Sequence, residues 1–173
     1  MKRRTLLSGL LAAPALPLLS GSAQAADAFH EATVEPIDVP AEYWRDKVSP
    51  AAWKVLYEED TERPRSSPLD KLYDAGTYVC AACHLPLFLS EHKFDSGTGW
   101  PSFTQPIAGH IGTKQDYALI WPRTEYHCAR CGGHQGHVFN DGPPPRGERW
   151  CNNGVALEFI AAGEPLPALR GDA

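Results

Sequence analysis

Four of the five cysteines stand in two Cys-x-x-C pairs, Cys80-Ala-Ala-Cys83 and Cys128-Ala-Arg-Cys131. Each pair presents two sulfur atoms from one tight turn, and the Gly-Gly dipeptide after the second pair lets the backbone curl. Two such turns brought together form the tetrahedral sulfur cage that suits Zn²⁺. The doubled motif therefore predicts one structural zinc ion, although the 44 residues between the pairs make a longer gap than usual.

Two other uses of these cysteines stay open from the residues alone. Each pair could close into a disulfide, which export to an oxidising compartment would favour. The pairs could also serve as thioredoxin-like redox centres, although the chain lacks the βαβ pattern that such a motif needs. A disulfide oxidoreductase of that kind predicts loss of activity, without loss of fold, when either pair is alkylated.

Cys151 is the cysteine left over, and its neighbours suit thiol chemistry. It follows Arg149 in the sequence, and His134 and His137 lie upstream. A free thiol has a pKa near 8.5, and a nearby cation lowers that pKa and increases the thiolate fraction. Nucleophilic catalysis by cysteine uses this combination. The spacing alone is equally consistent with a buried structural thiol.

The glycine-rich stretch SGTGWPSF, residues 96–103, could shape a surface for a ligand. Its two glycines permit close backbone approach, and Trp100 and Phe103 offer aromatic surface. The residues alone indicate either an apolar pocket or a turn that carries core aromatics.

Five motifs taken in order resemble the methionine sulfoxide reductase B family: C-x-x-C, SGTGWPSF, R-x-E-x-x-C-x-x-C, H-x-G-H-V-F-x-D-G-P and R-[aromatic]-C-x-N. The resemblance covers about residues 50–160. It implies a mostly β fold of two antiparallel sheets, the β-tent, with a four-cysteine zinc site away from the active site. It also implies reduction of the R epimer of methionine sulfoxide in peptides or proteins.

The resemblance implies roles for individual residues. Cys151 matches the nucleophile, Trp100 the aromatic that packs on the sulfoxide methyl group, and His137 the histidine that helps to protonate the sulfoxide oxygen. The other residues expected at the site are His134 and Asn153 in a polar pocket, Asp141 as their support, Arg149 beside the thiolate, and Phe103 and Phe139 in the substrate pocket. Attack by the thiolate would leave Cys151 as a sulfenic acid.

The sequence also departs from the family pattern. Gln135, Trp150 and Gly154 stand where leucine, tyrosine and serine are usual, and the change at Trp150 removes a phenolic hydroxyl. Thr98 stands where some members carry a second cysteine that resolves the sulfenic acid. With four cysteines on zinc, none remains for that step. We therefore expect an external thiol reductant, either a thioredoxin-like protein or a small thiol.

The elements that must position these residues are short. Ser49 as N-cap and Pro50 at the first helical position predict the start of a helix. Gly- and Pro-rich clusters at Ser96–Pro101 and Asp141–Gly147 separate β-like segments. The expected strands are Thr77–Cys80, Leu85–Leu89, Tyr117–Trp121, Glu125–Cys128, His137–Phe139 and Val155–Ile160. This pattern predicts a mostly antiparallel β domain with one or two short N-terminal helices.

The first 25 residues have the layout of an export signal, with a basic start, an apolar run and a small-x-small end. The apolar run Leu6–Leu19 is too short to span a membrane, and no membrane anchor is expected. Arg3-Arg4 resembles a twin-arginine signal, so we expect export to the periplasm of a Gram-negative bacterium and repair of oxidised exported proteins. An extended arm over 26–48, a catalytic domain over 49–161 and a loose tail over 162–173 would follow.

The charge balance limits the partners. The 173 residues carry a net charge of −5, which becomes −8 once Lys2, Arg3 and Arg4 leave with the signal. An acidic chain lacks the basic face that nucleic-acid binding requires, which argues against a nucleic-acid zinc ribbon. We expect a monomer that acts on oxidised protein or peptide substrates. The main non-enzyme alternative is a zinc-stabilised binding module in which Cys151 is inert.

Overall fold

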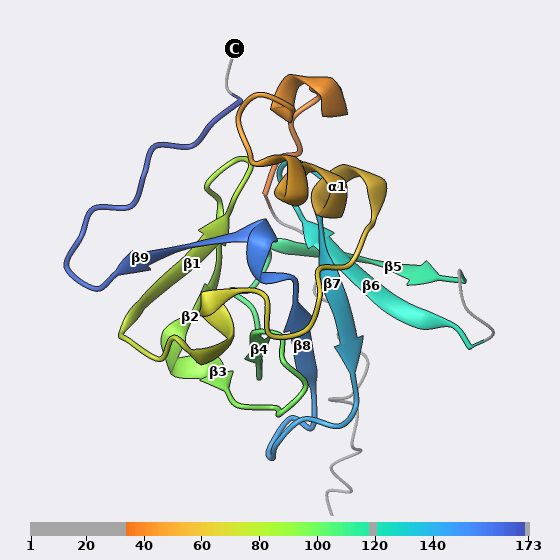
Figure 1. The fold of residues 1–173 in the computed structure, drawn as a ribbon, viewed down its shortest axis with the longest axis vertical. Coiled ribbons are helices and arrows are strands. Elements are labelled where there is room, and N and C mark those ends of the chain that lie inside the picture. Colours follow the sequence, from red (N-terminus) through yellow and green to blue (C-terminus); the bar gives the residue numbers. More distant parts are fainter. Residues whose placement is uncertain (1–33, 118–120, 172–173) are drawn as a thin grey trace, which may run out of the picture.

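The computed structural model describes residues 34–117 and 121–171. Two antiparallel sheets confirm the predicted mostly β class (Figure 1). The three-stranded sheet has the order β2-β1-β9 and the six-stranded sheet the order β3-β4-β8-β7-β6-β5. The strands of the first are β1 (Gly76–Cys80), β2 (Pro86–Leu89) and β9 (Leu157–Ala161). Those of the second are β3 (Lys93–Phe94), β4 (Ser102–Phe103), β5 (Ile111–Asp116), β6 (Arg123–Cys128), β7 (His134–Phe139) and β8 (Arg149–Asn152).

Helix α1 (Pro50–Glu58) begins where the sequence predicts. The Ser49 side chain accepts a hydrogen bond from the Ala52 amide at 3.1 Å, and Glu59 ends the helix in the left-handed region with φ 55°. One face of α1 is buried, and the helix lies over the upper end of β7 in Figure 1. The short 3₁₀ helices are η1 (Ala41–Trp44), η2 (Pro68–Lys71), η3 (Ser90–His92) and η4 (Gly154–Ala156). Among the described residues, no helix has the length and apolar character needed to cross a membrane.

One predicted strand is wrong. The strand expected at Tyr117–Trp121 is instead Ile111–Asp116, an edge strand of mainly polar residues. Tyr117 and Trp121 lie outside any strand and are 74% and 80% exposed, so their apolar character does not mark a buried segment; residues 118–120 lie outside the described part of the chain. The strand expected at Val155–Ile160 is β9, and η4 separates it from β8, which carries Cys151 and belongs to the other sheet.

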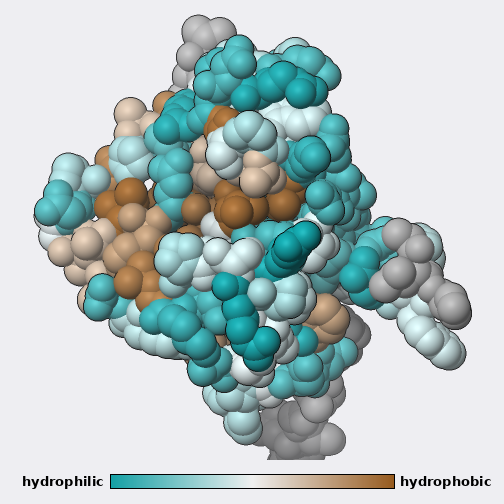
Figure 2. All heavy atoms as spheres, in the orientation of Figure 1, coloured by the Kyte–Doolittle hydropathy of each residue, from teal (hydrophilic) through white to brown (hydrophobic). Residues whose placement is uncertain are grey.

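The described parts of both chain ends pack beside the cysteine turns. The arm is not extended throughout, because η1 interrupts it and buries Trp44 completely. In the tail, the Arg170 amide donates to the Cys83 carbonyl at 3.0 Å, and the Arg170 carbonyl accepts from Arg130. Figure 2 shows apolar side chains gathered on the left and centre of this face, over β9 and beside the tail. The predicted export signal lies outside the described residues.

The core lies between the two sheets and is rich in aromatic side chains. Phe88 from β2 stacks on Phe103 from β4 with ring centroids 4.2 Å apart, and Tyr126 from β6 meets Trp150 from β8 at 5.1 Å. Phe103 and Trp150 are also paired across β4 and β8, so they share one face of the sheet. The predicted place of Phe103 in a substrate pocket is therefore wrong, because its side chain is fully buried in this core.

Candidate active site and metal cluster

The four paired cysteines come together at one place. Their Sγ atoms all lie within 4.8 Å of one another. The shortest contacts join different turns, with Cys80 3.6 Å from Cys131 and Cys83 3.5 Å from Cys128. A disulfide has an S–S distance of about 2.05 Å, so the thiols are free. Four sulfurs bound tetrahedrally at about 2.3 Å from zinc would lie about 3.8 Å apart. The donor set and spacing fit a metal ion.

Each pair sits on a turn of the same design. Cys80 ends β1 and Cys128 ends β6, and in both cases the residue four positions later donates its amide to the cysteine carbonyl at 2.9 Å. That residue is His84 in the first turn and Gly132 in the second, with φ 63° and φ 72°. Positive φ is easy for glycine and costly for histidine. The backbone of His84 is therefore locally strained in the turn that brings Cys80 Sγ and Cys83 Sγ into the cluster.

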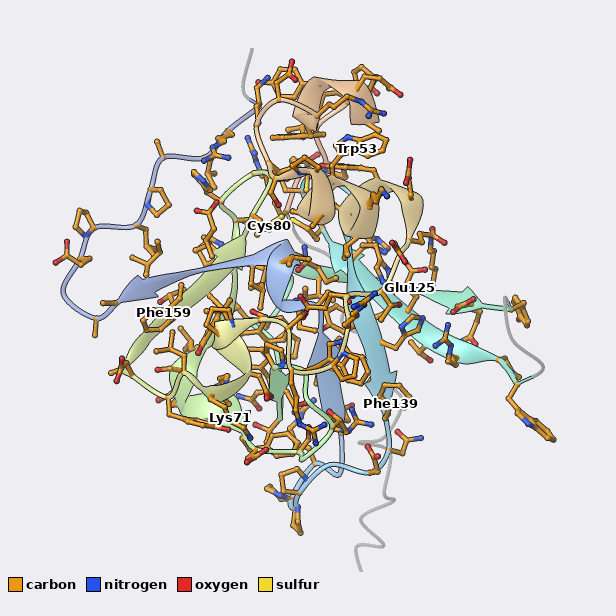
Figure 3. The ribbon with its side chains drawn as sticks, in the orientation of Figure 1. Trp53, Lys71, Cys80, Glu125, Phe139 and Phe159 are labelled. Atoms are coloured by element: carbon orange, nitrogen blue, oxygen red, sulfur yellow. The ribbon has the colours of Figure 1, made fainter. Side chains whose placement is uncertain are left out.

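Cys151 occupies the middle of the six-stranded sheet and is not part of the cluster. On β8 it is paired with Ser102 on β4 and with His137 on β7. A cleft of about 430 Å³, including its open mouth, lies over this point. Its lining residues are Thr61, Trp100, Arg123, His137, Phe139, Cys151, Asn152 and Asn153. Figure 3 shows Cys80 near α1 and Phe139 toward the opposite end of the molecule.

Burial and nearby donors act in opposite directions on the Cys151 thiol. Burial raises its pKa above the ordinary value, and contacts with Arg149, Thr98 and Ser102 lower the pKa by less. Arg149 is held in place by Asp141, whose two carboxylate oxygens accept from its guanidinium at 2.8 and 3.0 Å. The guanidinium also lies 4.3 Å from the centre of the Phe139 ring. Asp141 thus acts on the thiol through Arg149, which opposes the rise in the Cys151 pKa that burial causes.

His137 is fixed by a carboxylate that the sequence analysis missed. Its Nε2 lies 2.8 Å from Asp116 Oδ2, and the same oxygen accepts from Arg123 Nη2 at 2.6 Å. Burial lowers the pKa of His137, and the hydrogen bond to Asp116 opposes that shift. The sequence gives no signal for Asp116, because the edge strand that carries it has no alternating apolar pattern.

His134 lies behind His137 and does not line the cleft. It is 2% exposed, and its ring centre lies 5.4 Å from that of His137. Its Nδ1 lies 3.0 Å from Glu125 Oε1, and Lys114 Nζ lies 3.3 Å from the same oxygen. This arrangement places His134 as a support for His137.

Asn153 and Trp100 line the cleft, and both are held by the loop that follows α1. Asn153 Oδ1 accepts from the Glu62 amide at 3.1 Å, and its Nδ2 donates to the Gln135 carbonyl at 3.0 Å. Trp100 Nε1 donates to the Glu62 carbonyl at 3.1 Å. The sequence analysis missed Glu62, because no local pattern marks it.

Gln135 and Trp150, two departures from the family pattern, have defined environments. Gln135 is fully buried, its Nε2 donates to Cys80 Sγ at 3.6 Å, and its Oε1 accepts from Asn152 Nδ2 at 3.3 Å. It therefore links the cysteine cluster to the strand that carries Cys151. Trp150 alternates with Cys151 along β8, so its side chain faces the core.

The class of protein follows from its fold and its site. It is a β-rich domain of two antiparallel sheets with a cysteine at its candidate active site, and its four-cysteine cluster lies outside that cleft. Residues 48–161 match the family model described as the SelR domain. The chain is 48% identical over 134 residues to a peptide methionine sulfoxide reductase MsrB of Bradyrhizobium diazoefficiens, a match that covers 77% of this chain and 96% of that protein. It is 48% identical over 117 residues to the MsrB of Agrobacterium fabrum, covering 67% of this chain and 87% of that protein. The chain belongs to the peptide methionine sulfoxide reductase B family.

Proposed function

We propose that this protein reduces the R epimer of methionine sulfoxide in peptides and proteins, using Cys151 as the nucleophile. The observation that carries the proposal is the meeting of Cys151, Trp100 and His137 in one cleft, in a chain of this family. An indole provides an apolar face for a methyl group, and a histidine provides a proton, so the cleft supplies what a sulfoxide needs.

The reaction follows from these positions. The Cys151 thiolate attacks the sulfoxide sulfur while His137, or a water that it holds, gives a proton to the oxygen. The oxygen stays on Cys151 as a sulfenic acid and methionine leaves. An external thiol then attacks the Cys151 sulfur, and the oxygen leaves as water. A second thiol breaks this mixed disulfide and restores the Cys151 thiol.

The external reductant is part of the proposal, and it rests on where the other cysteines lie. All four are gathered in the cluster, and Thr98 rather than a cysteine stands beside Cys151. One turnover without reductant should therefore yield a sulfenic acid that dimedone traps. Recovery of an intramolecular disulfide that contains Cys151 would refute the external-thiol step.

We propose Zn²⁺ as the ion held by Cys80, Cys83, Cys128 and Cys131. Four buried or half-buried thiols form a donor set that suits zinc more than the hard cations calcium or magnesium. Zinc bound there would contribute folding free energy and would have no open position for substrate. Metal analysis of anaerobically purified protein should give one zinc per chain, and two disulfides with no zinc would refute the assignment.

We propose that the protein is exported by the twin-arginine route and repairs oxidised periplasmic proteins. The support is the basic start with Arg3-Arg4, the apolar run and the small-x-small end of residues 1–25. Replacing Arg3-Arg4 by Lys-Lys should leave uncleaved precursor in the cytoplasm. Unchanged processing and export of that variant would contradict this route.

The experiment that tests the reductase proposal compares separated R and S epimers of a methionine-sulfoxide peptide, with dithiothreitol as the reductant. Wild type should reduce only the R epimer, and Cys151→Ser should reduce neither. Unchanged turnover in Cys151→Ser would point to chemistry at the cysteine pairs. Absence of turnover in wild type would favour a metal-stabilised binding module.

A further inference from the structure

Glu62 makes four hydrogen bonds around the cleft, two to residues that line it and two to the backbone just beyond them. Its backbone amide donates to Asn153 Oδ1, and its carbonyl accepts from Trp100 Nε1, both at 3.1 Å. Its carboxylate accepts from the amides of Gly154 at 2.5 Å and Val155 at 3.1 Å. One residue of a loop thus binds both the glycine-rich segment and the end of the nucleophile strand.

The carboxylate end of this arrangement fixes the residues directly after β8. Gly154 and Val155 begin η4, and their amides at the start of a helix need acceptors. Each oxygen of the Glu62 carboxylate takes one of these amides. A neutral amide side chain has one oxygen only, so it could satisfy one of the two donors and would place an NH₂ group against the other.

The space around this contact is tight, which fixes the position of the loop. A Cβ added to Gly154 would lie 2.2 Å from Ser67 Oγ and 3.2 Å from Glu62 Oε1. The loop has a second anchor, because the Arg65 amide donates to the Gly99 carbonyl at 2.6 Å. Figure 1 shows this segment leaving α1 and running down across β7 toward β8.

We propose that Glu62 is a positioning residue for substrate binding, which sets the Trp100 indole and the Asn153 amide at fixed places relative to Cys151. This inference rests on the proposed reductase function. Glu62 itself does not line the cleft, so it acts through the two residues that it holds. Loss of its carboxylate would loosen the wall that receives the methyl group, while the surroundings of the thiol on β8 would stay as they are.

The test uses Glu62→Gln, which keeps the size of the side chain, and Glu58→Gln as the matched control on the exposed end of α1. Kinetics are measured with an R-sulfoxide peptide, well below the melting temperature of each variant. We expect KM to rise about tenfold in Glu62→Gln with a smaller change in kcat, because misplaced contact groups weaken binding. The rate at which iodoacetamide alkylates Cys151 should differ from that of wild type by less than about twofold in both variants.

A double-mutant cycle with Trp100→Phe tests whether Glu62 acts through Trp100. Phenylalanine keeps an apolar ring but lacks the N–H that donates to the Glu62 carbonyl. In the Trp100→Phe background, Glu62→Gln should therefore raise KM by no more than about twofold. The same KM rise in both backgrounds would overturn the proposal, as would a lower melting temperature in Glu62→Gln with unchanged KM. Absence of turnover in wild type would instead refute the reductase function.

Discussion

The cysteine cluster and the cleft are held together by different kinds of contact. Each half of the cluster is a local turn, closed by an amide four residues from its first cysteine. The cleft depends on contacts between distant residues, such as Glu62 with Asn153, 91 positions apart, and Trp100 with Glu62, 38 positions apart. We therefore expect that substitutions in the cleft can remove activity without unfolding the protein. The cluster joins the two sheets, so its loss should lower the stability of the whole fold.

The largest effect should come from breaking the cluster. Cys128→Ala removes one of the four proposed metal ligands and leaves a gap in a fully buried position. Metal binding to such sites is worth on the order of 10 kcal/mol in zinc-finger peptides, so we expect loss of metal and of cooperative folding. Metal content and thermal melting followed by circular dichroism measure both. A folded, metal-loaded Cys128→Ala with the melting temperature of wild type would contradict the structural role.

Replacing the thiol in the cleft should separate chemistry from folding. We expect Cys151→Ser to reduce turnover of the R sulfoxide by at least about 1,000-fold, the order of loss seen when a catalytic nucleophile is removed. Its metal content and melting temperature should match wild type, since Cys151 is not part of the cluster and alternates along β8 with the core residue Trp150. A parallel loss of metal in this variant would show that the two regions are not separate.

The same contrast explains what could be predicted from sequence. The four clustered cysteines stand in a repeated local motif, and the N-cap of α1 is a local contact, so both the cluster and the helix start could be predicted. Asp116 and Glu62 could not, because each reaches its partner through tertiary pairing that leaves no periodic pattern. Phe103 was misplaced for a related reason, since only its pairing with Trp150 shows that it faces the core.

Changing Asp116 should damage the cleft less than losing the thiol. Burial lowers the pKa of His137, Arg123 and His134 lower it further, and Asp116 raises it. Asp116→Asn removes the raising contribution, so the pKa of His137 should fall and less imidazolium should be present at any given pH. We expect kcat/KM to drop roughly 10-fold to 100-fold, a fraction of what a positioned general acid contributes.

A pH profile of kcat/KM tests whether a lower pKa of His137 causes this loss. The pKa of His137 is lowered and that of Cys151 is raised, so the form with both a thiolate and an imidazolium is a minor one. In that case the rate rises with pH up to the pKa of His137, stays level, and falls above the pKa of Cys151. In Asp116→Asn the bend of the rising limb should move to lower pH and the level part should drop, while the falling limb should stay. Asp46→Asn, on the exposed arm, is the control. An unshifted rising limb in Asp116→Asn would show that Asp116 does not set the ionisation of His137.

The smallest effect should come from the one side chain that links the two regions. Gln135→Leu removes the hydrogen bond to Cys80 Sγ and the one from Asn152, while leucine fills similar space. Asn152 Nδ2 keeps its bond to the Asn153 carbonyl at 2.8 Å, so no buried donor loses all its partners.

A net hydrogen bond contributes about 0.5–1.5 kcal/mol. We therefore expect unfolding free energy to fall by about 1 kcal/mol and metal transfer to a chromogenic chelator to become several-fold faster. Turnover should stay within about twofold of wild type, because the cleft keeps its own supports. A loss of turnover as large as that of Asp116→Asn would mean that the cluster helps to place Cys151 through Gln135, and that the two regions work as one.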